Sequence, residues 1–212
     1  YNSSDDTGFF VDDQNRLVLY VTQSAHYRFE TAFDLKTWTH VAFTYNNATN
    51  TVTGYLDGQV VSVTSQSNAS SETMTLPTAN VTMGYGPGNY GDYSLFTGAL
   101  DDFRIWNDVR TSSEIDTNKD TELTNADDVN LLRYYDFNQG IGGQDNSSEA
   151  SLIDRTGNSS GGSLANFTLN GDVSNWVAFS SLGGSTVPTV TTSTATSITS
   201  SEATLNGEVT AD

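Results

Sequence analysis

The chain has 212 residues, with 8 Lys and Arg against 26 Asp and Glu, so its formal net charge is −18. Such an acidic surface repels nucleic-acid phosphates and anionic lipids, which excludes nucleic-acid binding as a function. No segment reaches the roughly 20 consecutive apolar residues that a membrane span needs, so membrane insertion is not expected. Cysteine is absent, and disulfides therefore play no part in stabilising the fold.

Short strands separated by turn residues are predicted between residues 8 and 106. We expect them at 8–11, 16–22, 26–33, 38–45, 51–56, 59–64, 80–85 and 94–106. Asp57-Gly58 lies between two of them, and this pair is typical of a two-residue hairpin turn. Strands of this length with turns at regular intervals predict an all-β fold, an antiparallel β-sandwich.

The pattern changes after residue 110. Thr111-Ser112-Ser113-Glu114 is a capping box, which predicts a short helix near 112–119. Residues 131–138 restart the β pattern. Residues 178–188 are rich in Ser and Gly and read as a linker. Residues 189–212 alternate Thr and Ser with apolar residues, but they are too few to bury a core of their own.

Three runs in this order carry a family resemblance: 38–45, Tyr55-Leu56-Asp57-Gly58, and 100–106 with the sequence LDDFRIW. Together they resemble the laminin-G-like jelly roll of the concanavalin-A type. The resemblance implies one domain over 1–177, with 131–177 as a C-terminal extension that packs on the sandwich. The opening strands of such a domain are expected before Tyr1, so the chain is interpreted as an excised piece. Residues 189–212 resemble the truncated start of a fibronectin-III or immunoglobulin-like module.

A calcium site is the strongest candidate for metal chemistry. In an alternating strand, Asp101 shares the core-facing side with Phe103 and Ile105. A carboxylate in that position needs compensation, which a hard cation with oxygen ligands provides. The family resemblance implies calcium at Asp101, with Asp136 and Asp154 as further ligands. The alternative is that the Asp101 carboxylate caps backbone amides at the start of the strand.

A second calcium candidate follows the predicted helix. Acidic or amide residues fall at positions 1, 3, 5 and 12 of an EF-hand-like loop, namely Asp116, Asn118, Asp120 and Asp127. The run resembles half of a dockerin. It departs from that pattern at Thr121, where glycine is normal, and it has Asp instead of Glu at position 12. A short helix with a polar connector is therefore the favoured interpretation.

A glycine-rich run over 85–93 is the candidate ligand surface. Tyrosine rings stack on sugar faces, and neighbouring Asn and Asp side chains accept hydrogen bonds from hydroxyl groups. The candidate ligand residues are Tyr85, Asn89, Tyr90, Asp92 and Tyr93. The alternative is a connection whose tyrosines pack on the end of the sandwich. Trp38 and Trp106 lie in strand patterns and are expected in the core.

Catalysis has little support, so the chain is predicted not to be an enzyme. Glycosidases need a pair of carboxylates, and none of the seven glutamates pairs with another acid at the spacing seen on catalytic strands. The favoured function is an adhesion or glycan-recognition module of a large secreted or cell-surface bacterial protein, braced by calcium. Its partners would be a glycan or cell-surface ligand and neighbouring modules of the same chain. Two alternatives stay open: a structural spacer or surface-filament segment without a ligand, and an accessory module of a polysaccharide-degrading enzyme.

Overall fold

The computed structural model describes residues 8–22, 25–35, 37–65, 74, 83–84, 96–149, 151–159, 161–171, 173–177, 189–196 and 204–210. The chain forms two compact units. The first comprises Tyr1–Leu35, Thr39–Gln139 and Glu149–Ala165, and the second comprises Lys36–Trp38, Gly140–Ser148 and Asn166–Asp212. All of the β-sandwich belongs to the first unit.

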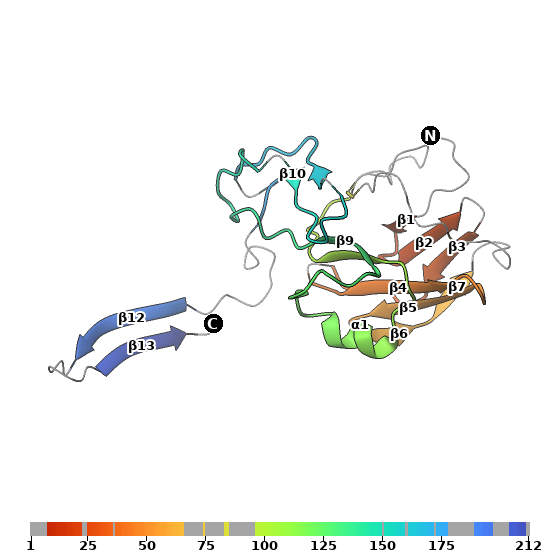
Figure 1. The fold of residues 1–212 in the computed structure, drawn as a ribbon, viewed down its shortest axis with the longest axis horizontal. Helices are drawn as coiled ribbons and strands as arrows, with labels where there is room; N and C mark the ends of the chain where they lie inside the picture. Colours follow the sequence, from red (N-terminus) through yellow and green to blue (C-terminus); the bar gives the residue numbers. More distant parts are fainter. Residues whose placement is uncertain are drawn as a thin grey trace. The chain divides into compact units, whose positions relative to one another are not determined.

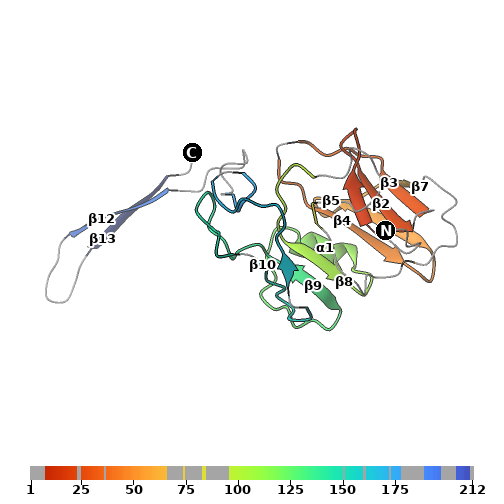
Figure 2. The same cartoon turned by 90° about the horizontal axis from the view of Figure 1, so that it is seen from above.

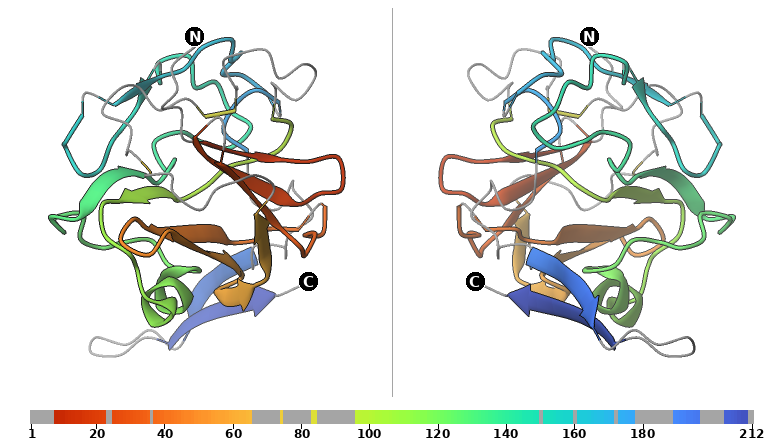
Figure 3. Two further views of the ribbon diagram at one scale, coloured as in Figure 1. Left: turned by 90° about the vertical axis from the view of Figure 1, so that its right-hand side faces the viewer. Right: turned by 90° about the vertical axis from the view of Figure 1, so that its left-hand side faces the viewer.

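Two antiparallel sheets form the sandwich. One sheet has the order β1-β2-β3-β7, with the bounds Gly8–Val11, Leu17–Thr22, Ala25–Phe29 and Val63–Ser65. The other has the order β4-β5-β6, with the bounds Val41–Asn46, Thr51–Leu56 and Gln59–Val61. Strands β1 and β2 lie in a different layer from β4 and β5 (Figure 1, Figure 3). The predicted fold class, an antiparallel β-sandwich with one short helix, is confirmed.

The hydrophobic core lies between these sheets. Buried Leu19 and Val21 of β2 and Tyr27 of β3 pack against partly buried side chains of the other strands, among them Phe43 and Tyr45 of β4. Strand β3 alternates buried and half-buried residues along its length, as a strand with one face in the core must. Each large apolar side chain buried here contributes about 1.5–3 kcal/mol to stability.

The Asp57-Gly58 turn joins β5 to β6 as predicted. Asp57 has φ of 46° and Gly58 has φ of 76°, the left-handed conformation that the tight hairpin turn needs at both positions. The Asp57 carboxylate also accepts a hydrogen bond of 2.9 Å from the His40 backbone N–H. The turn is thereby tied to the residue that precedes β4.

The first unit contains two further antiparallel pairs of strands. Strand β8 (Phe103–Trp106) pairs with β9 (Leu131–Tyr135), and the two lie side by side in both views (Figure 1, Figure 2). Phe9 links this pair to the sandwich, because its ring stacks on Phe103 and meets Phe43 edge-on. Two short strands, β10 (Ser151–Leu152) and β11 (Gly162–Ser163), pair with each other.

Helix α1 spans Ser112–Asn118 and follows β8. The predicted capping box is present, since Thr111 accepts from the Glu114 N–H and the Glu114 carboxylate accepts from the Thr111 N–H. Ile115 is the buried residue of this helix. Within the described part of the chain, no helix has both the length and the apolar character needed to cross a bilayer.

The second unit contains two features that are described separately. In the first, the buried Asn146 side chain donates to the carbonyl oxygens of Ile141 and Gln144 and to the side chain of Asn175, which joins 140–148 to 166–177. In the second, β12 (Thr189–Thr196) and β13 (Thr204–Thr210) pair as an antiparallel hairpin. The fibronectin-III assignment of 189–212 stays a prediction, and the predicted linker 178–188 lies outside the described residues.

Several predicted boundaries were wrong. The strand expected at 38–45 begins only at Val41, and Trp38 is 39% exposed instead of buried. The strand expected at 94–106 begins at Phe103, because Asp102 has φ of 54° and so leaves the extended conformation. The extension 131–177 stays a prediction; its residues 131–139 and 149–165 group with the first unit and the rest with the second. The strand expected at 80–85 falls largely outside the described residues.

Gly54 of β5 offers a test of the core. A methyl group added there would lie 2.6 Å from the Phe29 ring and 2.8 Å from a Val63 methyl. Gly54→Ala should therefore lower the free energy of unfolding by about 1–3 kcal/mol through overpacking. Gly8→Ala in β1 is the matched control, since no atom lies within 4 Å of the added group. Equal urea midpoints for the two variants would contradict the described packing.

Candidate functional site

Arg104 of β8 joins three parts of the first unit. Its guanidinium forms a two-pronged ion pair with Asp102 and donates to the backbone carbonyls of Asn118 at 2.9 Å and Thr121 at 2.5 Å. The same group lies over the Tyr134 ring of β9, 5.5 Å from its centroid. Arg104 thus fixes the C-terminal end of α1 and the chain after it against the β8–β9 ladder.

Tyr134 is the buried centre of this region, with 2% of its surface exposed. Its hydroxyl accepts a hydrogen bond of 3.1 Å from the Leu123 N–H and is hydrogen-bonded to the Asp102 carboxylate. Burial, reinforced by that carboxylate, raises the pKa of Tyr134 to about 12. The hydroxyl therefore stays protonated at neutral pH and holds the chain at Leu123 over the ladder.

Asp154 organises a turn beside β9. The Asp154 side chain is fully buried and accepts hydrogen bonds from the Tyr134 N–H, the Thr156 N–H, the Thr156 hydroxyl and the Ser159 hydroxyl. The Arg155 N–H donates in turn to the Tyr134 carbonyl at 2.8 Å. The Asp154 side chain and the Arg155 backbone thus satisfy the N–H and the carbonyl of Tyr134, as a neighbouring strand would.

The same turn reaches further along β9. The Asn158 amide donates to the carbonyl oxygens of Leu131 at 3.2 Å and Leu132 at 3.5 Å. Residues 154–158 therefore cover the edge of β9 that faces away from β8. An uncovered edge would expose unpaired backbone groups to other chains, so the turn also protects the fold from edge-to-edge association.

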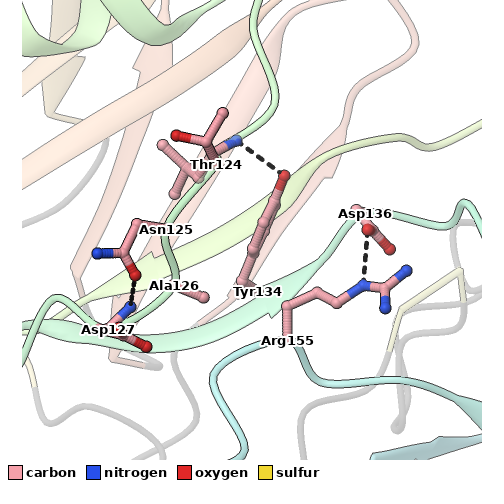
Figure 4. Close-up of a pocket in the computed structure, with 8 residues that line it drawn as sticks. Thr124, Asn125, Ala126, Asp127, Tyr134, Asp136 and Arg155 are labelled. Carbon is pink, nitrogen blue, oxygen red and sulfur yellow. Dashed lines mark hydrogen bonds and ion pairs between the residues drawn. The ribbon is translucent and has the colours of Figure 1, made fainter.

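A polar hollow of about 380 Å³ opens above the end of β9 (Figure 4). The backbone after α1 forms one wall, buried Tyr134 and Asp136 contribute the floor, and Arg155 stands on the other side. Arg155 Nε donates to Asp136 Oδ2 at 2.6 Å, which fixes the direction of the guanidinium. The lining residues are Leu123, Thr124, Asn125, Ala126, Asp127, Tyr134, Asp136 and Arg155.

The lining of the hollow combines hydrogen-bond donors with acceptors. Arg155 and the amide of Asn125 donate, and the carboxylates of Asp127 and Asp136 accept. The Asn125 side-chain oxygen accepts from the Asp127 N–H at 2.9 Å, which shapes the wall as a tight turn. Such an arrangement suits a ligand that presents several hydroxyl groups within a small volume.

Comparison with known proteins places this unit in a family. Residues 1–116, more than half of the chain, match the laminin-G family model described as the concanavalin A-like lectin/glucanases superfamily. The chain belongs to this superfamily. It also resembles the crystal structure of residues 221–444 of an S-layer domain-containing protein from Clostridium thermocellum, with 21% identity and a TM-score of 0.32. That match covers 55% of this chain and 64% of the other, and no curated protein gives a match.

In this lectin/glucanase-superfamily chain, the three predicted calcium ligands have different hydrogen-bond and ion-pair partners. Asp136 is paired with Arg155, and the buried oxygens of Asp154 are occupied by the hydrogen bonds described above. Asp101 precedes β8, and its carboxylate accepts from the Asp102 N–H at 2.9 Å, the capping role named as the alternative. Among the described residues, no group of three or more metal-ligating side chains could hold an ion.

Two of the three carboxylates are engaged by donors, so neither offers a bare oxygen pair to a cation. The calcium brace stays a prediction, and it now depends on Asp101.

The EF-hand-like run takes a different course from a calcium loop. Asp116 and Asn118 belong to α1, and the Asn118 amide donates back to the Glu114 carbonyl at 2.8 Å. The Lys119 ammonium lies 3.4 Å from Asp116 and 3.0 Å from Asp120. This geometry supports the helix with a polar connector. Asp127, the last residue of the set, lines the polar hollow instead.

Of the residues that line the hollow, the sequence patterns singled out Asp127 and Asp136, but as candidate calcium ligands. The predicted ligand residues Tyr85, Asn89, Tyr90, Asp92 and Tyr93 lie outside the described residues, so that surface stays a prediction. Arg155 was missed, although a signal existed: it directly follows Asp154 and is one of only 8 basic residues in a chain with 26 acidic ones. Tyr134 was read only as part of a strand.

Replacing Asp154 tests the turn that covers β9. Asp154→Ala removes the acceptor for the Tyr134 and Thr156 amides and should lower the free energy of unfolding by about 2–4 kcal/mol at neutral pH. Asp145→Ala is the control, because that exposed carboxylate accepts only from the nearby Ser147 and should change stability by less than about 1 kcal/mol. Similar losses in the two variants, measured by urea denaturation, would refute the assigned role.

The pH dependence of the same variant gives an independent check. Burial opposes ionisation of Asp154, but hydrogen bonds from Ser159, Thr156 and Tyr134 outweigh it and lower the pKa of the carboxyl. A lowered folded pKa stabilises the fold above the unfolded pKa near 3.8, and this contribution is lost as pH falls through the folded value. The stability difference between wild type and Asp154→Ala should therefore shrink below about pH 4.

Asp101 is expected to behave in the opposite way. Partial burial raises the pKa of its carboxyl, and the negative charges of Asp102, Glu122 and Asp136 add to the effect. The ionised form thus costs stability, so Asp101→Asn should raise the melting temperature slightly in chelator, by less than about 1 kcal/mol of unfolding free energy. If calcium binds there, added calcium should stabilise wild type but not the variant. Thermal melts with calcium and with chelator measure both effects.

Proposed function

We propose that this chain is a non-catalytic glycan-recognition module of a secreted or cell-surface bacterial protein, and that the polar hollow is where it contacts sugar. The observation that carries the proposal is the hollow itself: Arg155, Asn125, Asp127 and Asp136 present donors and acceptors around a space of about 380 Å³. Membership of the lectin/glucanase superfamily supports the same ligand class.

The dimensions and rigidity of the hollow agree with this role. Small-molecule sites commonly enclose roughly 300–1,000 Å³ and are largely formed before the ligand arrives. Here the Asp136 ion pair holds Arg155, and Tyr134 holds the opposing wall through the Leu123 N–H. A sugar would therefore meet polar groups that are already oriented, which reduces the entropy lost on binding.

The distribution of carboxylates supports a role without catalysis. Glycoside hydrolysis needs one carboxyl that donates a proton and a second that acts as nucleophile or base on opposite sides of the scissile bond. Within the described sandwich, none of the strands β1 to β11 contains Asp or Glu. In the hollow, the Asp136 carboxylate is engaged by the Arg155 guanidinium.

Binding by the full 212-residue chain to a glycan array tests the proposal. Arg155→Gln should weaken binding about ten- to a hundredfold, the effect of losing a hydrogen bond from a charged group. Arg28→Gln is the matched control: Arg28 is a partly exposed arginine of β3, paired with Glu30, and it does not line the hollow. Absence of any glycan signal would favour the spacer, and release of reducing sugar would identify an enzyme instead.

A further inference from the structure

Four carboxylates of the first unit lie in or near the hollow. Asp127 lines its wall and Asp136 its floor. The Asn138 amide, two residues after Asp136, donates to the Glu122 carboxylate at 2.7 Å, which brings Glu122 close to the same floor. Asp101 lies within electrostatic range of both Glu122 and Asp136.

Among the described residues, two arginines pair with carboxylates of this group. Arg155 is paired with Asp136, and Arg104 is paired with Asp102. The hollow and its surroundings therefore contain more carboxylates than guanidinium groups and carry a net negative charge. The five carboxylates are Asp101, Asp102, Glu122, Asp127 and Asp136, and the two guanidinium groups are Arg104 and Arg155. The rest of the chain does not reverse the sign, because its formal net charge is −18.

Two carboxyls near the hollow have raised pKa values, chiefly because they are partly buried. Burial raises the pKa of Asp102 and outweighs the stabilising charge of Arg104, with the charge of Glu122 adding to the rise. Burial also raises the pKa of Asp101, and the charges of Asp102, Glu122 and Asp136 add to it. These smaller contributions from neighbouring carboxylates agree in sign with the excess of acidic groups counted above.

We infer that the hollow selects sugars by charge, binding amino sugars with a free ammonium group most tightly, neutral sugars less tightly, and uronic or other acidic sugars least. An ammonium group near Asp127 gains a charge-assisted hydrogen bond, whereas a carboxylate would face Asp127 and Asp136 across the same short distance. Arg155 offsets this repulsion only in part, because its Nε is already paired with Asp136. This inference rests on the proposed glycan-recognition function.

Three short β-1,4-linked oligosaccharides of the same ring configuration separate the charge classes: a glucosamine trimer, an N-acetylglucosamine trimer and a glucuronic acid trimer. Calorimetric titration of the full chain at about pH 6, where the amine is protonated, should give this order of affinity, each step about tenfold or more. Raising the salt concentration from about 0.02 M to 0.3 M should reduce the difference between the first two ligands.

A pair of neighbouring substitutions separates a site from general attraction to an acidic protein. Asp127→Asn removes a carboxylate from the wall of the hollow, and Asp128→Asn removes the next one along the chain, which faces Arg110 outside it. Both variants change the net charge equally. Asp127→Asn should weaken glucosamine-trimer binding about tenfold and leave the N-acetylated trimer nearly unchanged, and Asp128→Asn should affect neither.

The possible outcomes distinguish the inference from the proposal beneath it. Equal weakening by the two variants, or an acidic trimer that binds as tightly as the amino trimer, overturns the charge selection and leaves glycan recognition standing. No binding of any trimer, with an empty glycan array, overturns both. The expected order, sensitive to Asp127 alone, supports both.

Discussion

The pairing of β8 with β9 is the contact on which the rest of the described site depends. The two strands are joined by α1 and an acidic connector, and they meet with Phe103 opposite Tyr135 and Arg104 opposite Tyr134. Cross-strand neighbours at that spacing interact directly, which is why the Arg104 guanidinium can lie over the Tyr134 ring. The connector has to return over this pair, and its backbone becomes one wall of the polar hollow.

The ladder also explains how a chain with so few basic residues tolerates converging carboxylates. Arg104 and Arg155 pair with two carboxylates whose side chains are mostly buried, Asp102 and Asp136. Isolated ion pairs on a surface contribute little, but each of these also fixes a segment of backbone or a wall of the hollow. Asp154 is stabilised differently, because hydroxyl and amide hydrogen bonds surround it and its cationic partner, Arg133 Nε, lies farther away at 3.8 Å.

That difference changes how the acidic motif residues are interpreted. Asp136 and Asp154 were assigned to calcium because aspartates near strand ends in such folds often bind it. In this structure, Asp136 orients Arg155 at the polar hollow and Asp154 completes the edge of β9. Both functions need an ionised carboxylate beside a strand, so the same residue pattern is compatible with a metal, an ion pair or a backbone cap.

Features that depend on a few neighbouring residues could be predicted from the sequence alone. The Asp57-Gly58 turn, the Thr111 capping box and the alternation that predicts a sandwich all follow from local backbone preferences and from the two-residue period of a strand. The roles of Asp154 and Arg155 could not, because they arise from contacts with β9 about 20 residues earlier in the chain. Only the tertiary structure decides which distant donor reaches a carboxylate, and that choice separates a metal ligand from a cap or a sugar-binding group.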